Sequence, residues 1–252
     1  MSSSPPSDPV TAAVLVIGDE ILSGRTLDQN THYIASYLMQ LGVDLREARV
    51  VPDVEEEIVA ALDALRARYT YVFTTGGIGP THDDITADAV ARAFGVEIAE
   101  DPRAIAMLLE RIPPDKLNAA RRRMARIPSG AELVENSVSK APGFMIGNVV
   151  VMAGVPMIMQ AMLDAVAPRL NTGAKMHIET IPTDGVHEGR YAAGLEALAA
   201  SHPNVSMGSY PQFSAAGVSA EIVLRSRDTA ALQAAAAAVR DLLTELRADA
   251  SR

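Results

Sequence analysis

The stretch VFTTGGIGPTHDDIT, residues 72–86, determines the fold that this sequence predicts. It begins with the apolar, β-branched pattern of a buried strand and then carries Gly76, Gly77 and Gly79. Glycine tolerates positive φ angles and lets a ligand approach the backbone. In an open parallel sheet, ligands bind beyond the carboxyl ends of the strands, and a helix N-terminus after such a loop favours anions. The stretch therefore predicts a phosphate-binding loop between a strand and a helix.

Strands and helices alternate around this loop. An apolar, β-branched run at 12–18 predicts a buried strand, and residues 46–52 predict a second strand. Apolar residues at helical spacing within 26–42 and 52–69 predict helices between the strands. This alternation favours a parallel sheet with right-handed crossovers. We therefore predict a three-layer α/β core with a mostly parallel sheet over residues 12–172.

Capping residues predict where some of these helices begin and end. Asp53 is followed three residues later by Glu56, which is the spacing of a capping box. Gly42 and Gly95 each follow a helical pattern, as C-cap glycines do. The helix that ends at Gly95 is predicted to span residues 83–95.

The pattern changes near Lys175. From there the chain reads as strand, helix, strand, strand and helix, which predicts a small separate α+β domain over residues 173–252. At the other end, residues 1–11 are rich in serine and proline, a composition that predicts a disordered tail.

Composition excludes several classes of function. The chain has no cysteine, which excludes disulfides and thiolate catalysis and fits a reducing, cytoplasmic location. A formal net charge of −9 argues against a nucleic-acid partner, because sequence-independent binding depends on neutralising phosphates. No apolar run is long enough to span a membrane, and the N-terminus does not have the pattern of a secretory signal.

Carboxylates follow the glycine loop and the first predicted strand. Asp83 and Asp84 close the loop, and Asp19 and Glu20 follow Gly18 at the end of the first strand. Acids in the first turn of a helix often only complement its dipole and cap its N–H groups. If the two strands are neighbours, however, the four carboxylates face one crevice, where they could bind a divalent cation that also binds phosphate. The residues alone leave both interpretations open.

Other polar residues near the loop also have two interpretations. The hydroxyls of Thr75 and Thr81 could contact phosphate or metal-bound water, or could only stabilise turns. His82 could ligate a transition metal or transfer a proton, or could be an exposed loop residue.

One basic cluster, residues 121–126, is present. On a helix, Arg122 and Arg126 would share a face and could form an anion clamp, although a solvated helix face is the simpler interpretation. Asn136 and Lys140 stand before the APGF sequence and could approach the same crevice, with Lys140 contacting phosphate.

Several motifs together resemble a known family. TTGGIGPTHDDIT resembles the Thr-Gly-Gly-x-Gly…Asp-x-Thr signature of the molybdopterin-binding fold, which the molybdopterin adenylyltransferases and the CinA family share. GDEILSGRTLDQN, RMARIPSGAELVENSVSKAPGF and VVMAGVPMIMQAML resemble further family elements, and the Gly-Pro-Thr-x-Asp-Asp form resembles CinA proteins and animal FAD synthases. NVSMGSYPQF resembles part of the small domain that follows in the FAD synthases. The resemblance covers residues 12–227.

The resemblance implies roles for individual residues. It places the cradle for phosphate and for a pterin or nucleotide on four residues: Gly76, Gly77, Gly79 and Thr81. The metal-linked acid of the adenylyltransferases falls on Asp84, and Asn30 ends the family's opening element as a ligand-binding residue. Asp83 stands where the adenylyltransferases usually have a basic residue, which argues against an anionic pterin unless a metal intervenes.

The activity that the resemblance implies is metal-dependent hydrolysis of a nucleotide pyrophosphate, such as FAD or ADP-ribose, with Mg²⁺, Mn²⁺, Co²⁺ or Ni²⁺. In this hypothesis Asp84, Asp83 and Glu20 are catalytic, while Asp84, Asp83 and Asp19 bind the metal. The alternatives are molybdopterin binding or adenylylation on the same cradle, and a non-catalytic nucleotide-binding module. The expected partners are a small nucleotide or pterin ligand and further copies of the chain, as a dimer or trimer.

Overall fold

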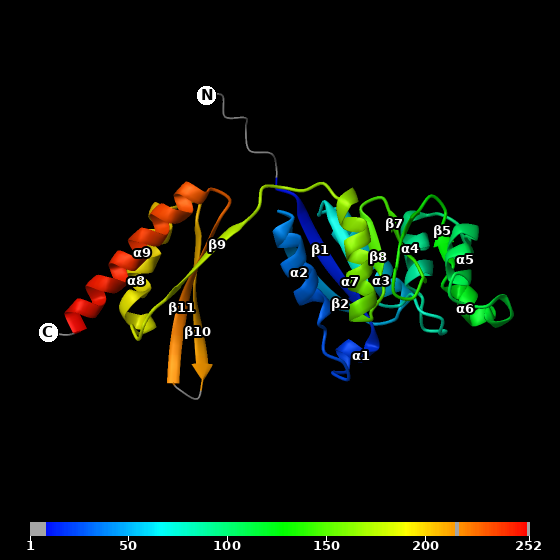
Figure 1. The fold of residues 1–252 in the computed structure, drawn as a ribbon, viewed down its shortest axis with the longest axis horizontal. Helices are drawn as coiled ribbons and strands as arrows, with labels where there is room; N and C mark the ends of the chain where they lie inside the picture. The colour runs from blue at the N-terminus through cyan, green and yellow to red at the C-terminus, as the bar shows by residue number, and fades with distance from the viewer. Residues whose placement is uncertain (1–8, 215–216, 251–252) are drawn as a thin grey trace, which may run out of the picture. The chain divides into compact units, whose positions relative to one another are not determined.

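The computed structural model describes residues 9–214 and 217–250 and divides the chain into the units Met1–Gly173 and Ala174–Arg252 (Figure 1). Of the predicted tail, residues 1–8 lie outside the described residues. No helix in the described ranges has the length and apolar character that crossing a membrane would require.

The first unit is built on the mostly parallel sheet that the sequence predicts. Its strand order is β2-β1-β3-β8-β7-β6. The first four strands of that order are parallel, whereas β7 and β6 run antiparallel to their neighbours. The strands are β1 (Thr11–Ile17), β2 (Asp44–Val51), β3 (Tyr71–Thr75), β6 (Glu132–Val134), β7 (Gly143–Ile146) and β8 (Val149–Met152).

Strand β1 is apolar from residue 12 to its end because both of its faces are buried there. Leu15 and Ile17 point to one core, and Val14 and Val16 point to the other. Helices cover both cores, so the predicted three layers are observed (Figure 1). One outer layer contains α2 (Asn30–Gln40) and α7 (Pro156–Val166), and the other contains α3 (Glu55–Arg66) and α4 (Thr86–Phe94).

The remaining elements of this unit are short. They are α1 (Asp19–Leu22), β4 (Ile98–Glu100), α5 (Pro102–Leu109), η1 (Pro114–Lys116), α6 (Ala119–Arg123), β5 (Arg126–Pro128) and η2 (Ala167–Arg169). The sequence did not predict α1. The basic cluster does not lie on one helix, as a shared face for Arg122 and Arg126 would require, because α6 ends at Arg123 and Arg126 begins a strand.

Two predicted helix starts are also wrong. The capping box at Asp53 and Glu56 does not form, because α3 begins after Val54 with no side-chain cap. The carboxylate of Asp53 instead accepts a hydrogen bond from the backbone N–H of Asp19 at 3.0 Å. The helix predicted from residue 83 begins at Thr86, whereas its predicted end is confirmed, since Gly95 has a φ of 64°.

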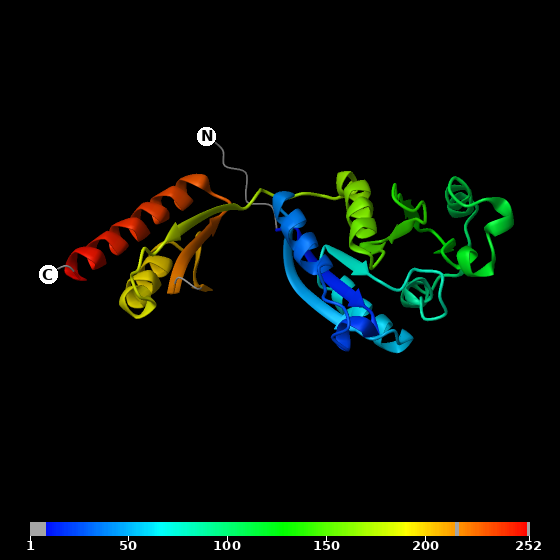
Figure 2. The ribbon, with the colours of Figure 1, turned by 60° about the horizontal axis from the view of Figure 1, so that its bottom comes forward.

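The second unit has the predicted order of strand, helix, strand, strand and helix. Its sheet order is β10-β11-β9, with every pair antiparallel. Buried residues of both helices and of the sheet form a separate core in this unit (Figure 2). The elements are β9 (His177–Pro182), α8 (Glu188–Ser201), β10 (Ser206–Ser214), β11 (Gly217–Ser226) and α9 (Thr229–Ala250).

The turn after β3 requires glycine for a steric reason. Gly76 has a φ of 102°, and a Cβ atom at this position would lie 2.1 Å from the carbonyl oxygen of Ile17. Since Ile17 ends the neighbouring strand β1, the absence of a side chain lets the two strand ends meet. This close approach positions the glycine loop beside the loop that follows β1.

We expect Gly76→Ala to destabilise the first unit by at least about 2 kcal/mol more than Gly130→Ala. Gly130 also has a positive φ, of 84°, but a Cβ atom there would meet nothing within 4 Å. The control therefore carries only the backbone cost of about 1–2 kcal/mol. Chemical denaturation of both variants measures the difference, and equal losses of stability would contradict the steric argument.

Candidate functional site

A cavity of about 580 Å³ opens at the carboxyl ends of the parallel strands. The loop after β3 forms one wall, and the loop before α7, with Gly154 and Val155, forms another. Predicted site residues that line this cavity are Glu20, Gly76, Gly77, Gly79 and Asp84. The structure therefore brings one acid of the first loop and one acid of the glycine loop to the same cavity.

The backbone of the glycine loop is arranged to bind an anion. Gly76 and Gly77 both have positive φ angles, of 102° and 65°. Within the described residues, the backbone N–H groups of Gly77, Ile78 and Gly79 make no hydrogen bond. Successive free N–H groups in such a turn form a concave site for a phosphate or carboxylate.

Asp84 stabilises the glycine loop itself. Its Oδ2 accepts hydrogen bonds from the backbone N–H of Thr81 at 2.7 Å and from the Thr81 hydroxyl at 2.5 Å. A Cβ atom on Gly79 would lie 2.6 Å from the same oxygen, so residue 79 must be glycine for the carboxylate to occupy this place. The interpretation of Asp84 as a cap of α4 is therefore wrong, because it caps the turn before that helix.

The neighbours of Asp84 face solvent. Thr81, His82 and Asp83 are exposed, and the side chain of His82 is 99% exposed. The pKa of Asp83 lies below its ordinary value, because the nearby Thr81 hydroxyl dipole and a backbone N–H favour its charged form, although the hydroxyl proton itself is donated to Asp84. The exposed position of His82 agrees with the simpler interpretation of a loop residue.

The two acidic loops come close together, as expected if their strands are neighbours, and β1 does pair with β3. The link between them is Asp53, which the sequence interpretation had assigned to a helix cap. Burial raises the pKa of the Asp53 carboxyl, and the charges of Glu20, Asp19 and Asp83 raise it further. The local sequence around Asp53 gave no sign of this role, because its spacing to Glu56 matched a capping box.

These acids do not form a complete metal site. Among the residues that the structure describes, no group of three or more histidine, aspartate or glutamate side chains is placed to hold a metal ion. Mg²⁺, however, is usually bound by one or two carboxylates together with substrate phosphates. Glu20 and Asp84 line one cavity beside the turn with free N–H groups, so they fit a cation that binds together with an anion. Asp19 and Asp83 contribute charge nearby.

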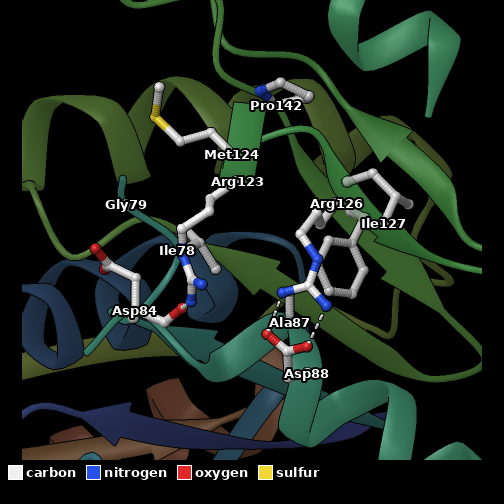
Figure 3. Close-up of a pocket in the computed structure, with 12 residues that line it drawn as sticks. Ile78, Gly79, Asp84, Ala87, Asp88, Arg123, Met124, Arg126, Ile127 and Pro142 are labelled. Atoms are coloured by element: carbon white, nitrogen blue, oxygen red, sulfur yellow. Dashed lines mark hydrogen bonds and ion pairs between the residues drawn. The ribbon is translucent and has the colours of Figure 1, made fainter. Parts of the chain in front are cut away.

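Arg123 lies beside the glycine loop, although the sequence interpretation did not single it out within the basic cluster. Its guanidinium lies beneath the glycine loop and donates to the backbone carbonyl of Asp84 at 3.0 Å (Figure 3). The alternative of an anion clamp formed by Arg122 and Arg126 is not supported by their contacts. Arg126 forms two hydrogen bonds to Asp88, at 2.8 and 2.6 Å, and Arg122 pairs with a glutamate of β4 at 2.6 Å.

Asn136 and Lys140 have different environments. Asn136 is buried and lines the cavity, where its side chain accepts hydrogen bonds from the N–H groups of Val138 and Ser139. The Lys140 ammonium lies 2.7 Å from the carboxylate of Glu110, which raises the pKa of Lys140. Lys140 is thus engaged by a carboxylate, and the structure gives its predicted phosphate contact no support.

Asn30 and Thr75 lie behind the main cavity. Both are buried, and both line an adjoining cavity of about 60 Å³ that also reaches Glu20 and Gly76. The Asn30 amide donates to the carbonyl of Gly154 at 2.7 Å. This contact joins the start of α2 to the loop before α7.

Comparisons with known proteins agree with this architecture. Residues 13–172 match the family described as a probable molybdopterin binding domain, and residues 175–250 match the middle domain of FAD synthase. A CinA-like protein of Geobacter sp. (strain M21) is 37% identical over 90% of this chain and 57% of its own length. A probable FAD synthase of Caenorhabditis elegans is 31% identical over 92% of this chain and 50% of its own length. The chain thus spans about half the length of these two relatives.

Solved structures support the fold of the first unit. A crystal structure of the protein CinA, with unknown function, from Thermoplasma acidophilum superposes with a TM-score of 0.61 and 34% identity. The match covers 65% of this chain and 99% of the other.

A further relative is similar in sequence over most of its own length. This protein of Pyrobaculum calidifontis is 35% identical over 80% of this chain and 81% of its own length.

We expect Asp53→Asn to raise the melting temperature at pH 7 by no more than a few degrees in the presence of a chelator. The raised pKa of Asp53 means that folding disfavours its charged form, so stability falls as pH rises through the folded-state pKa. Asparagine removes the charge and can still accept the Asp19 N–H. The difference between variant and wild type should therefore disappear below about pH 3, where Asp53 is protonated in both states.

Thermal unfolding at several pH values measures this effect. Asp115→Asn, at an exposed acid of η1, makes the same charge change outside the acidic loops and should leave the melting temperature almost unchanged. An Asp53→Asn variant that is less stable than wild type at pH 7 would show that the carboxylate is stabilising.

Proposed function

This chain belongs to the probable molybdopterin binding domain family, and we propose that it is a metal-dependent hydrolase of a nucleotide pyrophosphate of the FAD or ADP-ribose class. The observation that carries the proposal is the composition of the main cavity. The turn with free N–H groups at Gly77–Gly79 and the carboxylates of Glu20 and Asp84 line the same cavity. A diphosphate and a divalent cation together match these two kinds of group.

The glycine loop would bind the diphosphate. Free N–H groups of Gly77, Ile78 and Gly79 can each donate to a phosphate oxygen. Backbone donors are held in place by the turn, so they need no rearrangement when negative charge develops on the phosphate. Arg123 supports this arrangement from below, because it fixes the carbonyl of Asp84 and adds a positive charge behind the loop.

The carboxylates would hold the cation and move the proton. Mg²⁺, Mn²⁺, Co²⁺ or Ni²⁺ supplies positive charge that neutralises the diphosphate and makes water more acidic. In our proposal Asp84 binds the cation, with Asp19 and Asp83 as further ligands or nearby charges. Glu20 then accepts the proton of the attacking water, since its carboxylate lines the cavity from the opposite loop. Cleavage of the P–O–P bond would release AMP.

The rest of the cavity suits a flat, uncharged ring. Met124, Ile158 and Met162 line it together with prolines of the two loops. Apolar and sulfur-containing side chains pack favourably against aromatic rings. A nucleobase or flavin ring could occupy this part while the diphosphate lies on the glycine loop. The similarity to probable FAD synthases favours a flavin nucleotide within this class.

A pterin ligand is the second candidate. The matched family is described by molybdopterin binding, and the same apolar wall could pack against a pterin. The ionised Asp83, with its lowered pKa, disfavours an anionic pterin phosphate unless a cation lies between them. For this reason we place molybdopterin binding or adenylylation second.

We expect the full chain to release AMP from FAD or ADP-ribose in the presence of one of the four divalent cations, and none after chelation. The measurement is chromatography of nucleotides after incubation with FAD, ADP-ribose, NAD and ATP, each with each metal. Tight binding of a nucleotide without any release of AMP would instead identify a non-catalytic nucleotide-binding module. Transfer of AMP from ATP to a pterin would favour the second candidate.

We expect Asp84→Asn to lower kcat with the best of these substrates by at least about 100-fold, because asparagine binds a cation weakly and cannot hold the same charge. The amide oxygen of asparagine can still accept the Thr81 N–H, so the loop should persist. Asp84→Ala loses this bond as well and should cost a further 1 kcal/mol or so of stability. Near-normal turnover by Asp84→Asn would leave Asp84 with a structural role only.

A further inference from the structure

The small cavity behind the main cavity has its own chemistry. Its volume is about 60 Å³, and it lies between the ends of β1 and β3 and the start of α2. It adjoins the main cavity, with which it shares Glu20, Gly76 and Gly154. A ligand whose phosphate lies on the glycine loop could therefore extend into it.

The side chain of Asn30 has one unpaired atom in this region. Asn30 is 6% exposed, and its Nδ2 donates to the carbonyl of Gly154 at 2.7 Å. Because a carbonyl can only accept, this bond fixes the orientation of the amide. Its Oδ1 is buried and has no hydrogen-bond partner. A buried amide oxygen without a partner requires a donor from elsewhere.

Thr75 contributes a second unpaired oxygen. It is the last residue of β3, is 1% exposed and lines the small cavity. Its Oγ1 is also buried without a hydrogen-bond partner. Two buried, unpaired oxygens beside one cavity are unusual, because buried polar side-chain atoms are nearly always paired in folded proteins.

The charged residues that line the small cavity are both acids. Glu20 lies where the two cavities adjoin, and Asp28 already accepts hydrogen bonds from the N–H groups of Asn30 and Thr31. Within the described ranges, no lysine or arginine lines it. A phosphate is therefore disfavoured here, whereas a neutral group that donates hydrogen bonds is favoured. Vicinal hydroxyls have this chemistry, and carboxylates commonly bind the hydroxyls of ribose in nucleotide sites.

We propose that the small cavity is a subsite for the 2′- and 3′-hydroxyls of the ribose of the bound nucleotide. Asn30 Oδ1 and Thr75 Oγ1 accept from these hydroxyls, with the Glu20 carboxylate available at the opening of the subsite. In a nucleotide the ribose is joined directly to the phosphate, as the subsite adjoins the glycine loop at Gly76. The identity of the ligand rests on the proposed function, but hydroxyl recognition does not depend on turnover.

The matched pair Thr75→Val and Thr74→Val tests this proposal. Both threonines are fully or almost fully buried on β3, and both hydroxyls lack a partner. Their side chains point to opposite faces of the sheet, because side chains alternate along a strand. Thr75 shares its face with Phe73, which belongs to one core, and Thr74 shares its face with Val72, which belongs to the other. Thr75 alone of the two lines the small cavity.

The measurement is calorimetric titration of each protein with AMP and with 2′,3′-dideoxy-AMP, with and without Mg²⁺. We expect wild type to bind AMP about tenfold more tightly than the dideoxy analogue, which corresponds to the loss of hydrogen bonds to neutral groups. Thr75→Val should reduce this preference to about threefold or less and leave the affinity for the analogue unchanged. Thr74→Val should behave as wild type with both ligands.

The stability of the free proteins provides a second readout. Replacing an unpaired buried hydroxyl by a methyl group should leave the melting temperature unchanged or raise it, in both variants. Equal affinity of wild type for AMP and the dideoxy analogue would overturn the proposal, as would failure of both ligands to bind at millimolar concentration. So would an equal loss of affinity for both ligands in Thr75→Val.

The proposed hydrolysis has a separate outcome. If AMP binds with the expected preference for hydroxyls but no substrate releases AMP, the subsite stands and the hydrolase proposal fails. If AMP is released while 2′,3′-dideoxy-AMP binds as tightly as AMP, the hydrolase proposal stands and the subsite assignment fails.

Discussion

Thr86 makes two hydrogen bonds that hold the glycine loop in its functional shape. Its hydroxyl donates to the carbonyl of Gly76 at 3.0 Å, and its N–H donates to the carbonyl of Gly77 at 3.0 Å. These bonds turn both carbonyls away from the cavity, which leaves the N–H groups of the next residues free for an anion. Gly77 must be glycine here, since a Cβ atom would lie 2.1 Å from the Thr86 hydroxyl. The start of α4, the turn and the cavity wall thus depend on one buried threonine.

Beside this loop, the negative carboxylate of Asp84 and the positive guanidinium of Arg123 lie near each other without forming an ion pair. Asp84 faces the cavity from one side, and Arg123 binds its backbone carbonyl, not its carboxylate. The carboxylate is therefore not paired with the arginine, and its position is held by Thr81. On the loop after β2, the Asp53 carboxylate accepts a hydrogen bond from the N–H of Asp19 and is repelled by its acidic neighbours. A site that concentrates negative charge in this way is suited to a cation and is costly without one.

Several differences between sequence and structure have a common cause. Asp53 and Glu56 have the spacing of a capping box, and Arg122 and Arg126 have the spacing of one helix face. Spacing predicts contacts only when the segment is a continuous helix, and in both places the chain changes direction first. The Asp53 carboxylate accepts a hydrogen bond from the Asp19 N–H instead of capping α3. The Arg126 guanidinium donates two hydrogen bonds to Asp88 instead of lying beside Arg122. In each case a partner distant in the sequence competes with the local one.

The sequence by itself determined the sheet, its alternating helices and the glycine loop, because these follow from local patterns. A run such as residues 12–17 is apolar throughout only if both faces are buried, and glycines at 76 and 77 indicate a turn that side chains would block. Tertiary structure decided which polar groups share a cavity. Arg123 beneath Asp84, Asp53 between the acidic loops and the unpaired oxygens of Asn30 and Thr75 come together from separate loops. Their proximity depends on how the strand ends pack, and no local spacing encodes that distance.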